Sequence, residues 1–168
     1  GADVNTTNEH GSTALMIAAE RGYHPIVQLL LWRGANINSR NKEGSTALMG
    51  AALGGHRNVV QALLEKQADL NLHGKDGFTA LMLAAYWGHV STVEILMTAG
   101  AEVNAEAQDG DTALMLAAVN GHDEVVRTLL MQGAERDARN ESGFTALMLA
   151  AEAGHTSIGA SSSTRRFH

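Results

Sequence analysis

Apolar residues of this chain gather in short runs that alternate with polar, glycine-containing stretches at a constant spacing. The phrase Thr-Ala-Leu-Met recurs every 33 residues, and its threonines are Thr13, Thr46, Thr79, Thr112 and Thr145. A fixed period of this length is typical of a protein built from stacked copies of one structural unit. We therefore predict a stack in which each unit packs only on its neighbours, with function at positions where the copies differ.

Each unit is predicted to contain two short helices. In residues 41–73, the hydroxyl of Thr46 can cap free backbone N–H groups, and the apolar, alanine-rich run that follows favours a first helix. A glycine pair interrupts this run, and apolar residues at 59, 60, 63 and 64 then form one stripe of a second helix. The unit is therefore turn, helix, turn, helix, and the predicted fold class is all-α.

The period also divides the chain into units. Residues 8–40, 41–73, 74–106 and 107–139 are assigned as four full repeats, 140–155 as a partial fifth, and 1–7 as the tail of a preceding repeat. Because residues 1–5 resemble the internal stretches 34–38 and 100–104, we expect the chain to be a fragment of a longer protein. Residues 156–168 are serine-rich, and Gly159 stands where the previous unit has Val126. This segment has three open interpretations: a disordered tail, an abrupt capping variant, or an artefact of a shifted reading frame.

The repeated phrase is followed by Gly-His, by paired leucines and by Gly-Ala-x-Val-Asn; the Gly-His pairs include Gly55-His56, Gly88-His89 and Gly121-His122. This pattern resembles the ankyrin repeat. The resemblance implies a solenoid of L-shaped helix-turn-helix units joined by β-turn loops. It also implies a concave surface, formed by turn tips and first helices, that binds other proteins.

One departure from the family pattern concerns methionine. The family's usual Thr-Pro-Leu-His is here Thr-Ala-Leu-Met, which places a methionine at the same position of five units: Met16, Met49, Met82, Met115 and Met148. Methionine is an adaptable apolar residue that fills irregular gaps. We expect all five to pack in or beside the core between repeats, rather than to form a thioether site or a methionine-rich binding face.

Composition narrows the class of partner. The net charge is -6, and residues 74–139 supply all of it, which argues against nucleic acid because phosphate binding rests on clustered Lys and Arg. No apolar run approaches the roughly 20 residues that span a bilayer, so direct membrane insertion is not expected. The absence of cysteine suits a reducing, cytoplasmic or other intracellular compartment. We expect a monomer.

Neither catalysis nor cofactor binding is predicted. One histidine recurs at the same position of four units: His56, His89, His122 and His155. Equivalent residues of a stack point in parallel, whereas metal ligands and catalytic groups must converge, so we expect these histidines to make a turn-stabilising hydrogen bond. Asp109 and Asp111 flank a glycine but lack the twelve-residue spacing of a calcium loop. We therefore predict no enzyme activity, no cofactor and no metal.

The clearest functional signal is the placement of the aromatic residues. Phe78, Tyr86 and Trp87 belong to one unit and, with Phe144, occupy positions that vary between repeats and that in ankyrin proteins face the concave groove. Exposed aromatic side chains bury much apolar area at little cost in rotamer entropy. Phe78 has an alternative interpretation as packing against a neighbouring turn tip. A mixed, acid-leaning rim is expected from Lys42, Glu43, Leu53, Lys75, Asp76, Gln108, Asp109, Asp111, Val119 and Asn120.

The sequence thus favours a non-enzymatic module that binds a protein or peptide partner on its concave face. A basic or amphipathic partner would suit the rim. The alternative is a structural spacer or regulatory arm within a larger multidomain protein.

Overall fold

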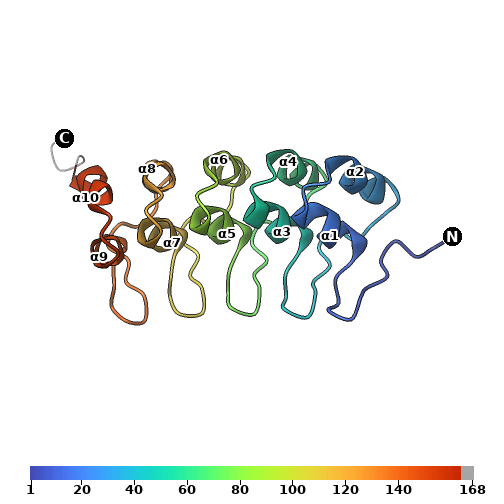
Figure 1. The fold of residues 1–168 in the computed structure, drawn as a ribbon, viewed down its shortest axis with the longest axis horizontal. Coiled ribbons are helices and arrows are strands. Elements are labelled where there is room, and N and C mark those ends of the chain that lie inside the picture. Colours follow the sequence, from blue (N-terminus) through green and yellow to red (C-terminus); the bar gives the residue numbers. More distant parts are fainter. Residues whose placement is uncertain (164–168) are drawn as a thin grey trace.

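The computed structural model is an elongated stack of helix pairs (Figure 1). It describes residues 1–163, with the backbone alone for 160–163. The ten helices of these residues are α1 (Ala14–Glu20), α2 (His24–Trp32), α3 (Ala47–Gly54), α4 (Arg57–Glu65), α5 (Ala80–Tyr86), α6 (Val90–Thr98), α7 (Ala113–Val119), α8 (Asp123–Met131), α9 (Ala146–Glu152) and α10 (Thr156–Ser163).

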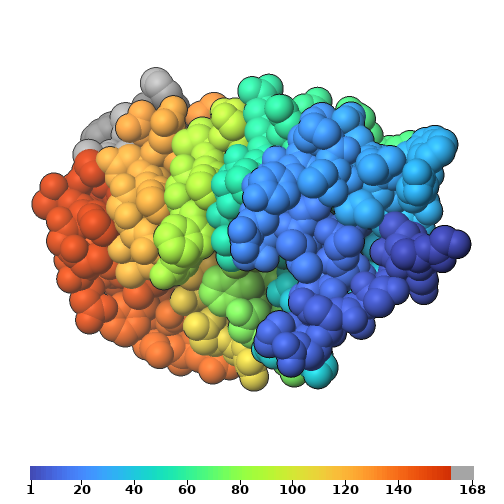
Figure 2. Space-filling view, turned by 45° about the vertical axis from the view of Figure 1, so that its right-hand side comes forward, coloured from blue at the N-terminus to red at the C-terminus, as the bar shows by residue number. Residues whose placement is uncertain are grey.

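The helices form two layers. The odd-numbered helix of each pair, here called the first helix, lies in one layer, and the even-numbered second helix lies in the other (Figure 1). The loops between successive pairs project beyond the layer of first helices, and their ends are here called the turn tips. In the space-filling view the repeats cross the surface as successive bands, each in contact with the next (Figure 2). The all-α repeat architecture predicted from the sequence is confirmed.

Each first helix begins where the repeated threonine caps it. In α3, Thr46 has an extended backbone, and its Oγ1 accepts a hydrogen bond of 3.3 Å from the backbone N–H of Met49. The threonines that precede the four remaining first helices accept the same hydrogen bond; they are Thr13, Thr79, Thr112 and Thr145. The hydroxyl satisfies a donor that the helix itself leaves unpaired, which explains why the threonine recurs at this position.

The core runs continuously between the two layers. Leucines on the inner side of second helices, such as Leu63 and Leu96, are completely buried, and alanines such as Ala51 and Ala52 allow neighbouring first helices to approach closely. The packing role expected for the methionines is confirmed for four of them, which are buried: Met16, Met49, Met82 and Met115. Met148 is 45% exposed, because within the described residues no further helix pair covers the outer side of α9.

The recurrent histidines join successive repeats, which differs from the turn contact expected from the sequence. Nε2 of His56 lies 2.8 Å from the carbonyl oxygen of Glu20, and Nε2 of His89 lies 2.9 Å from that of Leu53. The two later copies repeat this bond, His122 with Tyr86 and His155 with Val119. Because a carbonyl oxygen only accepts, Nε2 donates the proton. Each histidine thereby satisfies a carbonyl at the end of the preceding first helix.

Residues 156–163 form the helix α10 in a segment for which a disordered tail was one interpretation. Ile158 is only 1% exposed and occupies the position of Val125 in α8, so one buried isoleucine anchors the helix. The anchor lies one position before Gly159, so the missing apolar residue at Gly159 did not reveal it. Residues 164–168 lie outside the described part of the chain.

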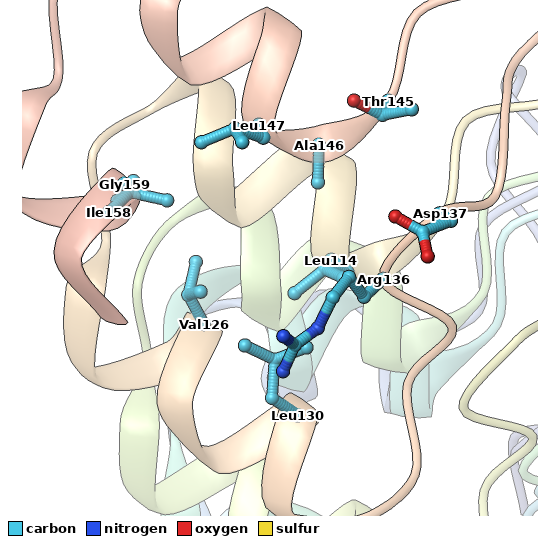
Figure 3. A pocket seen from close by; sticks show the side chains of 10 residues that line it. All are labelled: Leu114, Val126, Leu130, Arg136, Asp137, Thr145, Ala146, Leu147, Ile158 and Gly159. Carbon is cyan, nitrogen blue, oxygen red and sulfur yellow. The ribbon is translucent and has the colours of Figure 1, made fainter. Parts of the chain in front are cut away.

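An open cavity of about 480 Å³ lies between the last two repeats. Leu147 of α9 lies on one side of it, and Val126 and Leu130 of α8 lie on the other (Figure 3). Leu147 is 46% exposed, whereas Leu114, its equivalent one repeat earlier, is 3% exposed. Gly159 lines the cavity and stands where the preceding pair has the buried residue Val126.

Filling this cavity is expected to stabilise the stack. A Cβ at Gly159 would lie 3.8 Å from Cδ1 of Leu147, which is an ordinary van der Waals distance. Helix propensity alone makes alanine better than valine by roughly 0.5 kcal/mol, whereas each further buried methyl group contributes about 0.8 kcal/mol. Gly159→Val is therefore expected to exceed Gly159→Ala in stability by about 1 kcal/mol. Urea unfolding of both variants checks this, and the reverse order would show that the cavity is not filled.

Candidate functional site

The predicted binding residues lie on one surface, which we call the first-helix face. It is formed by the outward sides of the first helices α1, α3, α5, α7 and α9 together with the turn tips that precede them. Equivalent positions of successive repeats follow one another across this face. One such row consists of Glu20, Leu53, Tyr86, Val119 and Glu152, and the residues that come directly after them form a second row.

Tyr86 and Trp87 are the large aromatic side chains that the structure brings together on this face. Their ring centroids are 5.3 Å apart at an interplanar angle of 71°, which is an edge-to-face contact. Tyr86 is 37% exposed and Trp87 is 54% exposed. The carbonyl of Tyr86 accepts the hydrogen bond from His122, so the backbone of the pair is held by the next repeat.

The other two predicted aromatics are less accessible. Phe78 is partly buried and packs against the core, which favours the packing interpretation given for it above. Phe144 is also partly buried, and its N–H donates to Oδ1 of Asn140 within the last turn tip. Among the four predicted aromatics, the accessible surface is therefore concentrated at Tyr86 and Trp87, with Leu53 beside them in the row at 39% exposure.

The turn tips form a continuous edge along this face. The N–H of Lys75 donates to the carbonyl of Glu43 at 2.9 Å, and the N–H of Gln108 donates to that of Asp76 at 2.9 Å. Equivalent bonds are donated by the N–H of Lys42, which links the second tip to the first, and by the N–H of Glu141, which links the fifth tip to the fourth. The exposed side chains of the predicted rim, including Lys42, Lys75, Asp76 and Asp109, are thus carried on tips that support one another.

Three of the rim residues also hold local structure. Oδ1 of Asp76 accepts from the N–H of Phe78 at 3.1 Å, and Oδ1 of Asp109 accepts from that of Asp111 at 3.2 Å. The Nδ2 group of Asn120 donates to the carbonyl of Leu116 at 2.8 Å. These side chains therefore order the tips and the end of α7, whatever they contact in a complex.

Asp111 differs from the other acids of the rim because it is partly buried. Burial raises the pKa of its carboxyl group, the hydrogen bond from Nδ2 of Asn140 lowers it, and the nearby charge of Asp109 raises it again. The hydrogen bond measures 2.8 Å and joins two neighbouring tips. Asp111 thus contributes more to the stack than to the exposed charge of the rim.

Sequence reasoning missed a groove of about 260 Å³ on the same face. Gly50, Ile17, Leu53 and Leu83 line it, together with the acids Glu20 and Glu43. The signal that could have revealed it is Gly50 itself. The equivalent position carries isoleucine or leucine in every other repeat, at Ile17, Leu83, Leu116 and Leu149.

The described residues contain neither a metal-ion cluster nor a membrane-spanning helix. Between residues 1 and 163, no three or more His, Asp or Glu side chains are grouped so as to hold a metal ion. Within the same range, no helix has the length and the apolar character needed to cross a bilayer.

Comparison with known proteins identifies the family. A search of curated proteins gives no match. The family model described as ankyrin repeats (3 copies) matches residues 15–107 and 96–159, and these matches follow the helix pairs described above. Because the model accounts for most of the sequence, the chain belongs to the ankyrin repeat family.

Proposed function

We propose that this chain is a non-enzymatic module that binds a protein or peptide partner on its first-helix face, the concave surface of the family. Ankyrin repeats generally serve as protein–protein interaction modules and are typically not enzymes. The observation that carries the proposal is the contact pair of Tyr86 and Trp87, two large aromatic side chains that remain exposed although they touch each other. Such residues are the commonest anchors of protein interfaces.

The repeat fold does not require aromatic residues at these positions. The equivalents of Tyr86 include Glu20 and Val119, and the stack forms equally well around them. Two adjacent aromatic residues that the fold does not need, and that together expose apolar surface on one face, are better explained by binding than by packing. The pair also lies in the third of five helix pairs, so contacts can extend from it in both directions along the stack.

The surface around the pair is organised before any partner arrives. The histidine bonds fix the ends of the first helices, and the backbone bonds between tips fix the rim. A surface that is already ordered loses little conformational entropy on binding, which favours affinity. The charged residues of the rim, Lys42, Lys75, Asp76 and Asp109, are suited to orienting a partner rather than to supplying most of the binding energy.

The proposal is tested by capture of partners from a lysate of the source cells. Three immobilised proteins are compared: the parent, Tyr86→Ala/Trp87→Ala, and the control Trp32→Ala/Met131→Ala. The control removes two exposed apolar side chains from second helices, where Trp32 is 77% and Met131 is 72% exposed. We expect one or more proteins to be retained by the parent and the control and lost from the first variant. Equal retention by all three would contradict the proposal and favour the spacer or regulatory arm.

A further inference from the structure

The groove on the first-helix face has a composition that no other repeat reproduces. Gly50 lies inside α3 and has no side chain, whereas its four equivalents are isoleucine or leucine. Its φ is not positive, so the backbone conformation does not require glycine. Glycine within a helix is about 1 kcal/mol less favourable than alanine. The position therefore has a local disadvantage that another feature of the molecule must explain.

Close packing of α1 against α3 explains the glycine at position 50 only in part. A Cβ at Gly50 would lie 3.2 Å from Cβ and 3.4 Å from Cα of Glu20. These distances are tighter than ordinary van der Waals contacts, so a side chain at this position requires α1 to move away by a few tenths of an ångström. The equivalent leucines, such as Leu83, are accommodated in the same stack beside the larger residue Leu53. Close approach of α1 thus does not by itself account for the missing side chain.

The missing side chain leaves a groove with apolar walls. Ile17 is 43% exposed, Leu53 is 39% exposed and Leu83 is partly buried, and all three line it. Its volume is about 260 Å³. A protein cavity of roughly 150 Å³ holds a benzene molecule, so one aliphatic or aromatic side chain fits here.

The charged side chains that line the groove are all acidic. Among the described residues that line it are the carboxylates of Glu20 and Glu43 and no basic side chain. Glu20 ends α1 and Glu43 lies on a turn tip, and both are exposed. A cation held near these two carboxylates, at the edge of an apolar surface, interacts more strongly than it would in bulk water.

We propose that the Gly50 groove receives one apolar side chain of a linear peptide segment, with a Lys or Arg of that segment beside Glu20 and Glu43. The inference rests on the proposed function, because it names the kind of segment that the first-helix face binds. Leu53 lines the groove and immediately precedes Tyr86 in its row, so the groove and the aromatic pair lie on successive repeats. Neighbouring helices pack 8–10 Å apart and an extended chain rises about 3.3 Å per residue. A second apolar residue about three positions along the segment would then meet Tyr86 and Trp87.

Selection from a random library of linear 12-residue peptides displayed on phage, with the whole chain as bait, tests this directly. We expect the enriched peptides to share an apolar residue with Lys or Arg nearby. The dissociation constant of the best peptide is then measured by fluorescence anisotropy. Gly50→Leu, which fills the groove, is expected to weaken binding at least tenfold. Glu20→Gln/Glu43→Gln, which keeps the shape and removes the charge, is expected to weaken it severalfold, with a smaller effect at high salt.

Thr98→Leu serves as the control, because it adds a leucine at an exposed position of the second helix α6 and should leave binding unchanged. Circular dichroism and thermal unfolding establish that each variant is folded. If Gly50→Leu does not fold, the isosteric glutamine pair still tests the groove.

Three outcomes separate this inference from the proposed function. Loss of binding in Gly50→Leu or in the glutamine pair, with none in the control, supports the inference. Peptides that depend on Tyr86 and Trp87 but bind the groove variants like the parent overturn the inference and leave the proposed function standing. A selection that enriches no peptide overturns the inference alone, because the proposed function also allows a folded partner, whereas enriched peptides that respond to neither set of changes contradict both.

Discussion

Gly55→Ala is expected to lower the free energy of unfolding by about 2–4 kcal/mol. Gly55 has a φ of +67°, a left-handed conformation that disfavours any residue with a side chain. A Cβ there would also lie 2.5 Å from Nδ1 of His89, which is too close for the ring to stay in place. Displacement of the ring breaks the hydrogen bond to Leu53 that joins the two repeats. Urea unfolding monitored by circular dichroism measures the effect.

Gly34→Ala is the matched control for this prediction. Gly34 has a φ of +81°, but a Cβ there would meet no atom within 4 Å, so only the conformational cost of about 1 kcal/mol is expected. At the same position of the next repeat, Gln67 adopts a φ of 62°, which shows that a side chain is tolerated. In a His89→Ala background the ring is absent, and Gly55→Ala should then cost no more than the control. Equal effects of the two alanines in the parent background would contradict the role assigned to the ring.

Leu63→Ala is expected to destabilise the stack by about 2–5 kcal/mol, because it leaves a cavity in the core. Leu63 lies on the inner side of α4 and is completely buried. Each repeat meets only its neighbours, so a cavity at this central site weakens the packing on both sides.

The control is Leu29→Ala, the same substitution at a leucine of α2 that is 51% exposed. Removal of a half-exposed side chain leaves no enclosed cavity, so a loss below about 1 kcal/mol is expected. Urea unfolding of the two variants gives the comparison directly. Similar losses at both positions would mean that the second helices do not bury their inner leucines as described.

Local and repeated features of the fold could be predicted from the sequence. The threonine caps, the helix pairs and the burial of Met49 and its equivalents depend on patterns within about ten residues, and the chain presents them up to five times. The bond from His89 to Leu53 joins residues 36 apart, and its partner depends on how the repeats stack. Period and composition therefore identified the recurring histidine but not the group that it contacts.

The candidate site shows the same limit. The exposure of Tyr86 and Trp87 agrees with the position that the repeat register gives them, and their role in binding stays a prediction. Phe78 has the same aromatic character, yet it is partly buried, because burial at the tip depends on the neighbouring repeat. The groove at Gly50 results from an absent side chain, so no chemically distinctive residue marks it in the sequence.

The most direct test of the central claim, that the first-helix face binds the partner at its aromatic pair, uses tryptophan fluorescence. The chain contains two tryptophans, Trp32 and Trp87, so Trp32→Phe makes Trp87 the sole reporter. Titration with the captured partner is predicted to shift the emission of Trp87 to shorter wavelength and to protect it from acrylamide, because a half-exposed indole becomes buried. In Trp87→Phe, Trp32 on the opposite layer should not respond. Saturated binding that leaves Trp87 as exposed as in the free protein would contradict the account.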